Sequence, residues 1–359
     1  MHQPAHDWNA LLASFGEALS SVEMQTAFRQ SAQGDWDIAS EKMAYLPVNY
    51  STKMMEYQQC YWNGNGQPTH DLSVVLYHEK HPIALWPLSL SRSDANELRV
   101  SSNGGAELHP PLFVAGLAAK TTKTLTSKCF AALNQFCTGN RIGGWQSASP
   151  FSEETGLSAW HVKAMQAGGR ASLKHELFLE VTRPIEEIKS GFRKSYKALV
   201  NSGAKWWSTH LLTQADPAIW EEFRALHQSV AGRSTRSRDS WGAQLDAIAC
   251  GAAFFVYLRD CADKMVGGGL FYVTRDECVY AVGAYDRSLF DKPLGHVVQY
   301  RAIEEMKRRN IRWYKLGKRS YPGDIPEPSS KELSISDFKQ GFASHLFPIH
   351  EIRYEQKES

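Results

Sequence analysis

The spacing of apolar residues along the chain predicts alternating helices and strands. Apolar positions three to four residues apart indicate helices within the first thirty-odd residues, from Ser51 to Tyr61 and from Thr121 to Cys137. Runs of apolar and β-branched residues from Leu72 to Tyr77 and from Ile83 to Leu90 predict the two strands of a hairpin. Helices interspersed with short strands favour an α+β fold, with mixed sheets flanked by helices.

A similar order of elements recurs in the second half. The hairpin from Phe254 to Tyr272 resembles the earlier one from Val74 to Leu88, and each leads through a Pro-containing loop to a helix and another strand. Repetition on this scale indicates duplicated domains rather than a solenoid. Small residues from Gln166 to Arg170 fit a connection between them. We therefore predict one domain over residues 1–166 and a second over 167–359.

Five further elements are expected after this connection. Leu177 to Val181 alternates as a strand, and Thr182-Arg183-Pro184 begins a helix that buries apolar residues as far as Leu199. The stretch from Lys205 to Ala252 holds a strand, a helix from Pro217 to Val230 and a helix from Ser240 to Ile248.

The most informative stretch runs from residue 280 to residue 342. Tyr280 to Asp286 is an apolar strand that ends in polar groups, and a turn from Phe290 leads into a helix from His296 to about Arg309. Asn310 is the expected left-handed stop of that helix. Ile311 to Gly317 forms another strand, and residues 335–342 close the unit. Gly295 stands near the first free N–H groups of the helix, and such groups attract anions.

Four short motifs follow one another in this stretch: Gly283-Ala284-Tyr285-Asp286, Pro293-Leu294-Gly295, Leu316-Gly317 and Phe338-Lys339-Gln340-Gly341-Phe342. In their order and spacing they resemble the acyltransferase domain of the FemABX family, which shares the GNAT fold. The likeness is best from about His175 to Pro348, and it implies two GNAT-like domains in tandem.

The chain differs from the family in one respect. Family members that load peptidoglycan precursors carry a long coiled-coil arm inserted in the second domain. Here the region from Lys205 to Ala252 is already occupied by the expected strand and helices, so we expect no coiled-coil arm. The departure leaves the acceptor, and the way in which a transfer RNA would be held, open.

Lys339 is the first candidate for chemistry. Its ammonium, flanked by Phe338 and Phe342, can stabilise the oxyanion that develops as an amine attacks an ester or thioester. The resemblance implies this role for the lysine of the Phe-Lys motif. The alternative is an ordinary lysine beside two core-facing phenylalanines.

Tyr285, Asp286 and His296 bracket the turn before the helix and are the other catalytic candidates. Asp286 or His296 can accept a proton from the attacking ammonium, and histidine has the better ordinary pKa for that task. Alternatively, Asp286 caps its own turn and His296 only opens the helix. The turn has a single glycine and an acidic Asp291, both unfavourable for the pyrophosphate of coenzyme A (CoA).

Cationic and aromatic residues in two loops are candidates for binding the substrate. Arginines suit bidentate recognition of phosphate, as in a nucleotide-activated sugar, a lipid-linked acceptor or a tRNA acceptor stem. The residues that leave the last strand before Lys339 stand where ligands often gather. A solvated surface is the alternative for the arginine loop. The candidates are Arg233, Arg236, Arg238, Lys318, Arg319, Tyr321 and Phe338.

Composition narrows the classes of function. A formal charge of only +2 gives no global signature of polyanion binding, and six cysteines without CxxC spacing argue against a zinc site or a disulfide framework. No nucleophile elbow, HExxH motif or P-loop occurs. The first seven residues lack the pattern of a signal peptide and no apolar run reaches eighteen residues, so we expect a cytoplasmic protein without an integral membrane segment.

Together these features predict an enzyme that transfers an aminoacyl or acyl group. It would form an amide on the amino group of a cell-envelope or nucleotide-linked amino sugar, with aminoacyl-tRNA or acyl-CoA as donor. We expect no tightly bound cofactor and no metal. Two alternatives stay open: an acyl-CoA-dependent N-acetyltransferase, and a non-catalytic binding protein with the GNAT fold.

Overall fold

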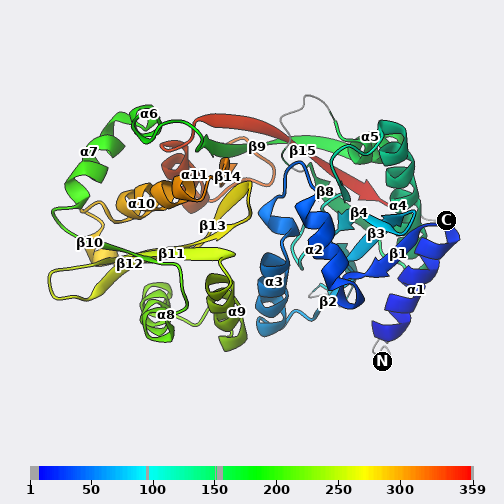
Figure 1. Cartoon of the computed structure of the whole chain (residues 1–359), viewed down its shortest axis with the longest axis horizontal. Coiled ribbons are helices and arrows are strands. Elements are labelled where there is room, and N and C mark those ends of the chain that lie inside the picture. Colours follow the sequence, from blue (N-terminus) through cyan, green and yellow to red (C-terminus); the bar gives the residue numbers. More distant parts are fainter. Residues whose placement is uncertain (1–7, 94–96, 150, 152–156, 357–359) are drawn as a thin grey trace. The chain divides into compact units, whose positions relative to one another are not determined.

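The computed structural model describes residues 8–93, 97–149, 151 and 157–356 (Figure 1). Contacts divide the chain into two compact units. Unit 1 comprises Met1–Tyr45, Gly66–Leu173 and Ile349–Ser359, and unit 2 comprises Leu46–Asn65 and Lys174–Pro348. The domain boundary after residue 166 stays a prediction, and the signal-peptide argument concerns residues that lie outside the described ranges.

Unit 1 contains four α-helices and short strands among its described residues. One sheet has the order β1-β3-β4-β7 and another the order β2-β5-β6, while β8 pairs antiparallel with the end of β15 (His345–Glu355). The elements are α1 (Trp8–Ser21), β1 (Gln25–Phe28), η1 (Arg29–Ser31), α2 (Gln33–Glu41), β2 (Thr69–Asp71), β3 (Val74–His78), β4 (His81–Trp86), β5 (Ser89–Arg92), β6 (Leu98–Ser101), β7 (Leu112–Phe113), α4 (Ala119–Gly139), β8 (Gly144–Ala148) and α5 (Ala159–Gln166).

The predicted hairpin is present as β3 and β4, which pair antiparallel, but its second strand is shorter than expected. The chain leaves β4 after Trp86, and residues 89–92 form β5 in the other sheet. Pro87 stands at the break, and a proline cannot donate a hydrogen bond to a continuing ladder.

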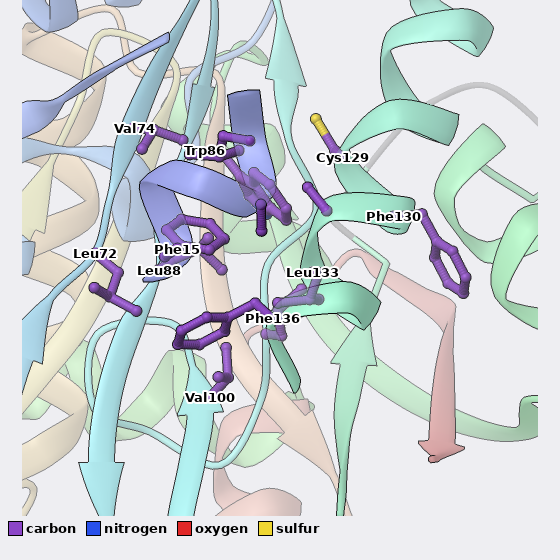
Figure 2. Close-up of a cluster of buried hydrophobic side chains, with 14 of the residues drawn as sticks. Phe15, Leu72, Val74, Trp86, Leu88, Val100, Cys129, Phe130, Leu133 and Phe136 are labelled. Atoms are coloured by element: carbon purple, nitrogen blue, oxygen red, sulfur yellow. The ribbon is translucent and has the colours of Figure 1, made fainter. Parts of the chain in front are cut away.

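The core of unit 1 forms where α1 and α4 pack on the strands (Figure 2). Phe15 of α1 is fully buried, and its ring centroid lies 5.2 Å from that of Phe136 on α4 and 6.1 Å from that of Trp86 on β4. Cys129 and Leu133 complete the buried stripe of α4. The helical spacing of apolar residues in these two segments is thereby explained by a shared core.

Unit 2 is built on a larger sheet with the order β10-β11-β12-β13-β14-β9. The chain segments β9 and β15 each begin in one unit and end in the other. The elements are η2 (Val48–Tyr50), α3 (Thr52–Gly64), β9 (Arg170–Glu180), α6 (Ile185–Gly191), α7 (Lys194–Gly203), β10 (Ser208–Leu212), α8 (Pro217–Ala231), α9 (Arg238–Ala249), β11 (Ala253–Arg259), β12 (Met265–Val273), β13 (Glu277–Tyr285), η3 (Arg287–Leu289), α10 (Leu294–Arg308), β14 (Trp313–Arg319) and α11 (Ser330–Gln340).

Helices cover both faces of this sheet. Figure 1 shows α8 and α9 on one side of β11 and β12, with α7 and α10 on the other. Alternate residues of β11 serve the two faces: Phe254 and Val256 pack in the cluster with α10, whereas Phe255 and Tyr257 pack in the cluster with α8 and α9. The α+β class with mixed sheets flanked by helices is confirmed.

The helix predicted to run from Thr182 to Leu199 is in fact two helices, α6 and α7. Phe192 and Arg193 between them have extended backbone angles, with ψ of 155° and 135°. The backbone N–H of Arg193 donates to the carbonyl of Gly341 at 2.9 Å, and its guanidinium pairs with Asp337 at 3.0 Å. A tertiary contact with the end of α11 thus accounts for the break, which local periodicity cannot reveal.

The region from Lys205 to Ala252, all of it described, forms β10, α8 and α9. The two helices have 15 and 12 residues and pack against the sheet. The expected absence of a coiled-coil arm at this place is confirmed.

The pairing of β13 with β14 is the feature that creates a site. These two strands run parallel and pair only where Glu277–Val279 faces Trp313–Lys315. β13 nevertheless continues to Tyr285 and β14 to Arg319. Ala281 is an extra residue in β13, because Leu270 pairs with Val282 and the next residue pairs with Tyr280. Such a bulge bends its strand, so the two strands part towards their carboxyl ends.

The segment Leu46–Asn65 is hydrogen-bonded to the rest of unit 2 at the start of β13. The backbone N–H of Val48 donates to the Glu277 carboxylate at 2.9 Å, and that of Leu46 donates to Asp276 at 2.8 Å. Glu277 is 2% exposed, so its carboxylate depends on protein partners rather than on water.

Glu277→Ala is therefore expected to lower the free energy of unfolding by about 2 kcal/mol, because Val48 loses its acceptor. Chemical denaturation measures the change, with Glu327→Ala on the exposed loop before α11 as the matched control. A loss no larger than the control's contradicts the role given to Glu277.

Candidate functional site

A pocket of about 850 Å³ opens in unit 2, where β13 and β14 no longer pair. This volume lies within the range of small-molecule sites. Most of its walls come from four elements: Tyr280, Gly283, Ala284 and Tyr285 on β13, Tyr314 and Leu316 on β14, Leu294, Gly295, His296 and Gln299 on α10, and Ser334, Ile335, Phe338 and Lys339 on α11.

Glycines of β12 make room for the tyrosines that line this pocket. A Cβ atom on Gly267 would lie 2.5 Å from Cδ1 of Tyr285, and one on Gly269 would lie 2.7 Å from Cε2 of Tyr280. The two tyrosine hydroxyls lie 3.1 Å apart. Burial raises the pKa of Tyr280 to about 12 and raises the pKa of Tyr285 well above its usual value. Both hydroxyls therefore keep their protons at neutral pH and can donate them.

The first turn of α10 forms another wall. The residue that precedes the helix is Pro293, which provides no side-chain cap, and Gly295 and His296 line the pocket. A Cβ atom on Gly295 would lie 3.2 Å from Cζ of Phe338 and 3.8 Å from Cζ of Tyr285. Free N–H groups at a helix start, together with the helix dipole, favour an anion here.

Lys339 reaches the pocket from the last turn of α11. Its Nζ atom would lie only 3.1 Å from a Cβ atom on Gly317, and Gly317 has a φ of +109° that favours glycine. Burial lowers the pKa of Lys339, while the negative charge of Glu176 opposes this shift. Glu176 is 7% exposed and pairs with Lys315 at 2.9 Å. Among the described residues, none forms an ion pair with Lys339, so its charge is available to a ligand.

Three aromatic rings lie around His296. Its ring centroid lies 4.4 Å from that of Tyr196, 5.1 Å from that of Phe338 and 6.1 Å from that of Phe342. Burial lowers the pKa of His296 to about 4. The imidazole is therefore neutral at pH 7, but it is a weaker base than an ordinary histidine.

Asp286 lies outside the residues that line the pocket. Its carboxylate accepts hydrogen bonds from the hydroxyl of Ser288 at 2.7 Å and from the backbone N–H of Ser288 at 3.0 Å, and it lies 3.8 Å from Lys264. The hydrogen bond from the Ser288 hydroxyl is the main cause that lowers the pKa of Asp286. The geometry is that of a cap on η3, which is the alternative that the sequence left open.

The predicted arginine loop does not reach the pocket either. Arg236 donates to the Tyr57 hydroxyl at 3.1 Å, lies 3.0 Å from Nε2 of His227 and covers the ring of Trp241. It therefore ties α3 to α8 and α9. Arg233 lies on the same loop and Arg238 is the first residue of α9, and both are exposed.

The residues after β14 are partly structural. Arg319 donates to the Ser336 hydroxyl at 2.8 Å and covers the ring of Tyr321, while Lys318 is exposed. None of these three lines the pocket, whereas Phe338 does. The pocket thus brings together Tyr285, His296, Phe338 and Lys339 from the candidates, and a substrate-binding role for the others stays a prediction.

Several lining residues were not singled out from the sequence. The charged ones are Arg287, Lys292 and Lys331, so that with Lys339 four cations and no carboxylate line the pocket among the described residues. The neutral ones are Tyr280, Gln299 and Tyr314. One sequence feature could have predicted that Tyr280 and Tyr285 line a pocket. Three successive glycines in β12 stand opposite the strand that carries these two tyrosines.

Two absences are found within the described ranges. No group of three or more His, Cys, Asp or Glu residues is arranged there to hold a metal ion. No helix in that part of the chain is both long enough and apolar enough to cross a membrane.

Comparison with known proteins agrees with this architecture. Residues 192–326 match the model of a family described as an acetyltransferase (GNAT) domain, and no curated protein sequence matches. In structure, the chain is similar to FemX, with a TM-score of 0.67 and 10% identity over 92% of this chain and 97% of FemX. The chain has a tandem GNAT fold. The FemABX likeness is one of structure, and it covers almost the whole chain.

Two other solved structures are also similar to most of the chain. L-PGS from Bacillus licheniformis has a TM-score of 0.56 at 11% identity, over 91% of this chain and 92% of that one. A tandem GNAT protein from the clavulanic acid biosynthesis pathway has a TM-score of 0.50 at 12% identity, over 94% of this chain and 100% of that one. The GNAT match and these transferase neighbours together support an acyl- or aminoacyltransferase.

The low pKa of His296 can be tested through folding stability. Between the folded pKa of about 4 and an ordinary unfolded value near 6.5, the unfolded state binds more protons, so stability falls as pH falls. His296→Gln removes this contribution, whereas the other histidines are common to both proteins. Denaturation at pH 7.5 and pH 5 should show a larger loss of unfolding free energy in the wild type than in the variant. Equal losses contradict a buried, neutral His296.

Proposed function

We propose that this protein transfers an aminoacyl or acyl group to an amine, forming an amide on a cell-envelope or nucleotide-linked amino sugar. The reaction is direct attack of the amine on the donor's carbonyl carbon, without a covalent enzyme intermediate. The observation that carries the proposal is the partly buried, unpaired ammonium of Lys339 in a pocket bounded by parted strands and an uncapped helix start.

Each step of the reaction has a group that fits it. The amine nitrogen bonds to the carbonyl carbon, and the carbonyl oxygen becomes an oxyanion that the Lys339 ammonium stabilises. The carbon–oxygen bond of an ester donor, or the carbon–sulfur bond of a thioester, then breaks. Tyr285, whose raised pKa keeps its hydroxyl protonated, supplies a proton to the leaving atom and regains one from water, while the proton lost by the amine passes to water.

The donor is proposed to be anionic, and two donors fit. Four cations and the first turn of α10 face the pocket, which suits the phosphates of either aminoacyl-tRNA or acyl-CoA. Acyl-CoA-dependent N-acyltransfer is the second candidate. It is favoured by one observation: Asp291, the acidic residue that counted against CoA, is not among the residues that line the pocket.

The chemical role of Lys339 can be tested by substitution. Lys339→Ala is expected to lower kcat about 10²-fold to 10³-fold, because the oxyanion loses its cation. Lys331→Ala, which removes an exposed cation of the same pocket, is the matched control and should mainly raise KM for the donor. A variant of Lys339 that keeps full turnover contradicts the oxyanion role.

The same lysine predicts a pH dependence. Its lowered pKa means that the ammonium loses its proton, and turnover falls, as pH rises through a value below the usual 10.5. Glu176→Gln removes the charge that raises this pKa, so the alkaline fall in kcat should move to lower pH. Glu327→Gln, on an exposed loop, serves as control. An alkaline limb that does not move, or moves upward, contradicts the coupling.

Donor choice is settled by isothermal titration of the protein with acyl-CoA thioesters and with aminoacyl-tRNA. Tight binding of the thioester alone supports the N-acyltransferase candidate. Absence of transfer from both donors to amino-sugar acceptors, despite binding, contradicts an enzyme and favours a binding protein with the same fold.

A further inference from the structure

A buried amide lies at the inner part of the pocket. Gln299 is on α10, one turn after His296, and is 3% exposed, while its side chain still lines the pocket. Tyr314 on β14 is fully buried, and its hydroxyl donates to Oε1 of Gln299 at 2.5 Å. The carbonyl end of the Gln299 side chain therefore has its partner within the protein.

The amino end of the same side chain has none. Among the described residues, no acceptor bonds to Nε2 of Gln299, and Nε2 is not one of the fully buried side-chain atoms, so it is accessible to a ligand. Turning the amide would leave the buried Tyr314 hydroxyl proton without an acceptor among the described residues, so the orientation in which Oε1 accepts is favoured. The side chain thus offers the pocket a donor in a fixed direction.

The hydroxyl that bonds to Gln299 is neutral. Burial raises the pKa of Tyr314 well above its usual value, so its hydroxyl stays a donor, and the Tyr280 hydroxyl is likewise protonated. Of the four cations that line the pocket, Arg287 and Lys331 are exposed and Lys292 and Lys339 are partly buried, and none of them hydrogen-bonds to Gln299. A ligand that fits this arrangement has its charge beside these cations and an uncharged hydrogen-bond acceptor beside Nε2 of Gln299.

We propose that Gln299, oriented by Tyr314, is a specificity-determining residue that donates from Nε2 to a neutral carbonyl oxygen in the buried arm of the ligand. This rests on the proposed function, and it specifies the ligand's class: a mainly apolar arm interrupted by an amide, ester, thioester or ketone carbonyl. Gln299 bonds to the ligand's carbonyl oxygen, and Tyr314 is a positioning residue because it orients Gln299.

The test uses two neutral probes that differ only at the acceptor, octan-2-one and 2-methyloct-1-ene, in which CH₂ replaces the carbonyl oxygen. Ligand-observed NMR titration of the full-length protein gives a dissociation constant for each. Gln299→Met and Gln299→Leu keep about the volume of the side chain and remove the amide N–H donors. In both variants the ratio of the ketone's constant to the alkene's should rise about threefold to tenfold.

The role of Tyr314 is tested in the same assay. Tyr314→Phe should raise the ratio in the same direction, and it should have no further effect in the Gln299→Met background. Alkene binding that is unchanged in every variant shows that the pocket remains folded. Because the assay contains neither donor nor amine, its outcome does not depend on whether Lys339 supports transfer.

An unchanged ratio in the Gln299 variants overturns the proposal, as does a failure of the ketone to bind the wild-type protein saturably. If Tyr314→Phe weakens ketone and alkene equally, the positioning role is wrong and Tyr314 only packs.

Discussion

The separation of β13 and β14 is the constraint on which the candidate site depends. Hydrogen bonding between the strands stops after Val279 and Lys315, and the bulge at Ala281 turns β13 away. Beyond that point the facing edges of β13 and β14 are not hydrogen-bonded to each other, and side chains lie between the two strands. A sheet that stayed closed would bury these positions in its core and would leave no space for a ligand.

Side chains packed against glycines on two walls determine the shape of this space. The glycines of β12 let Tyr280 and Tyr285 lie against the sheet, so that their hydroxyls meet at 3.1 Å. On the opposite wall Gly317 lets Lys339 approach the backbone of β14. In both places a Cβ atom would occupy the volume that a functional side chain needs. Backbone without side chains is therefore as much a part of the site as the residues that carry the chemistry.

Local patterns in the sequence were sufficient for much of the fold. The apolar periodicity of α4 and α10 marked both helices within two residues at each end, and Asn310 does have the left-handed φ of 58° expected of a helix stop. Long-range contacts were not accessible in this way. The break between α6 and α7 depends on Gly341, which is far along the chain.

The candidate site was predictable to a similar degree. The order of the motifs placed Tyr285, His296, Phe338 and Lys339 together, and the pocket includes all four. Asp286 and Arg236 were chosen for their chemistry, but their hydrogen bonds within the protein show that each has a structural partner. Gln299 gave no signal in the sequence, because its importance comes from Tyr314 on another element.

We propose that the donor binds between β13 and β14 with its carbonyl beside Lys339. The decisive measurement is a crystal structure of the protein with an unreactive donor analogue, either an S-alkyl-CoA or a tRNA acceptor-stem minihelix that carries an amide-linked amino acid. We expect phosphate at the first turn of α10 and the reacting end of the analogue within reach of the Lys339 ammonium. An analogue bound along the loop from Arg233 to Arg238, with the pocket empty, would contradict it.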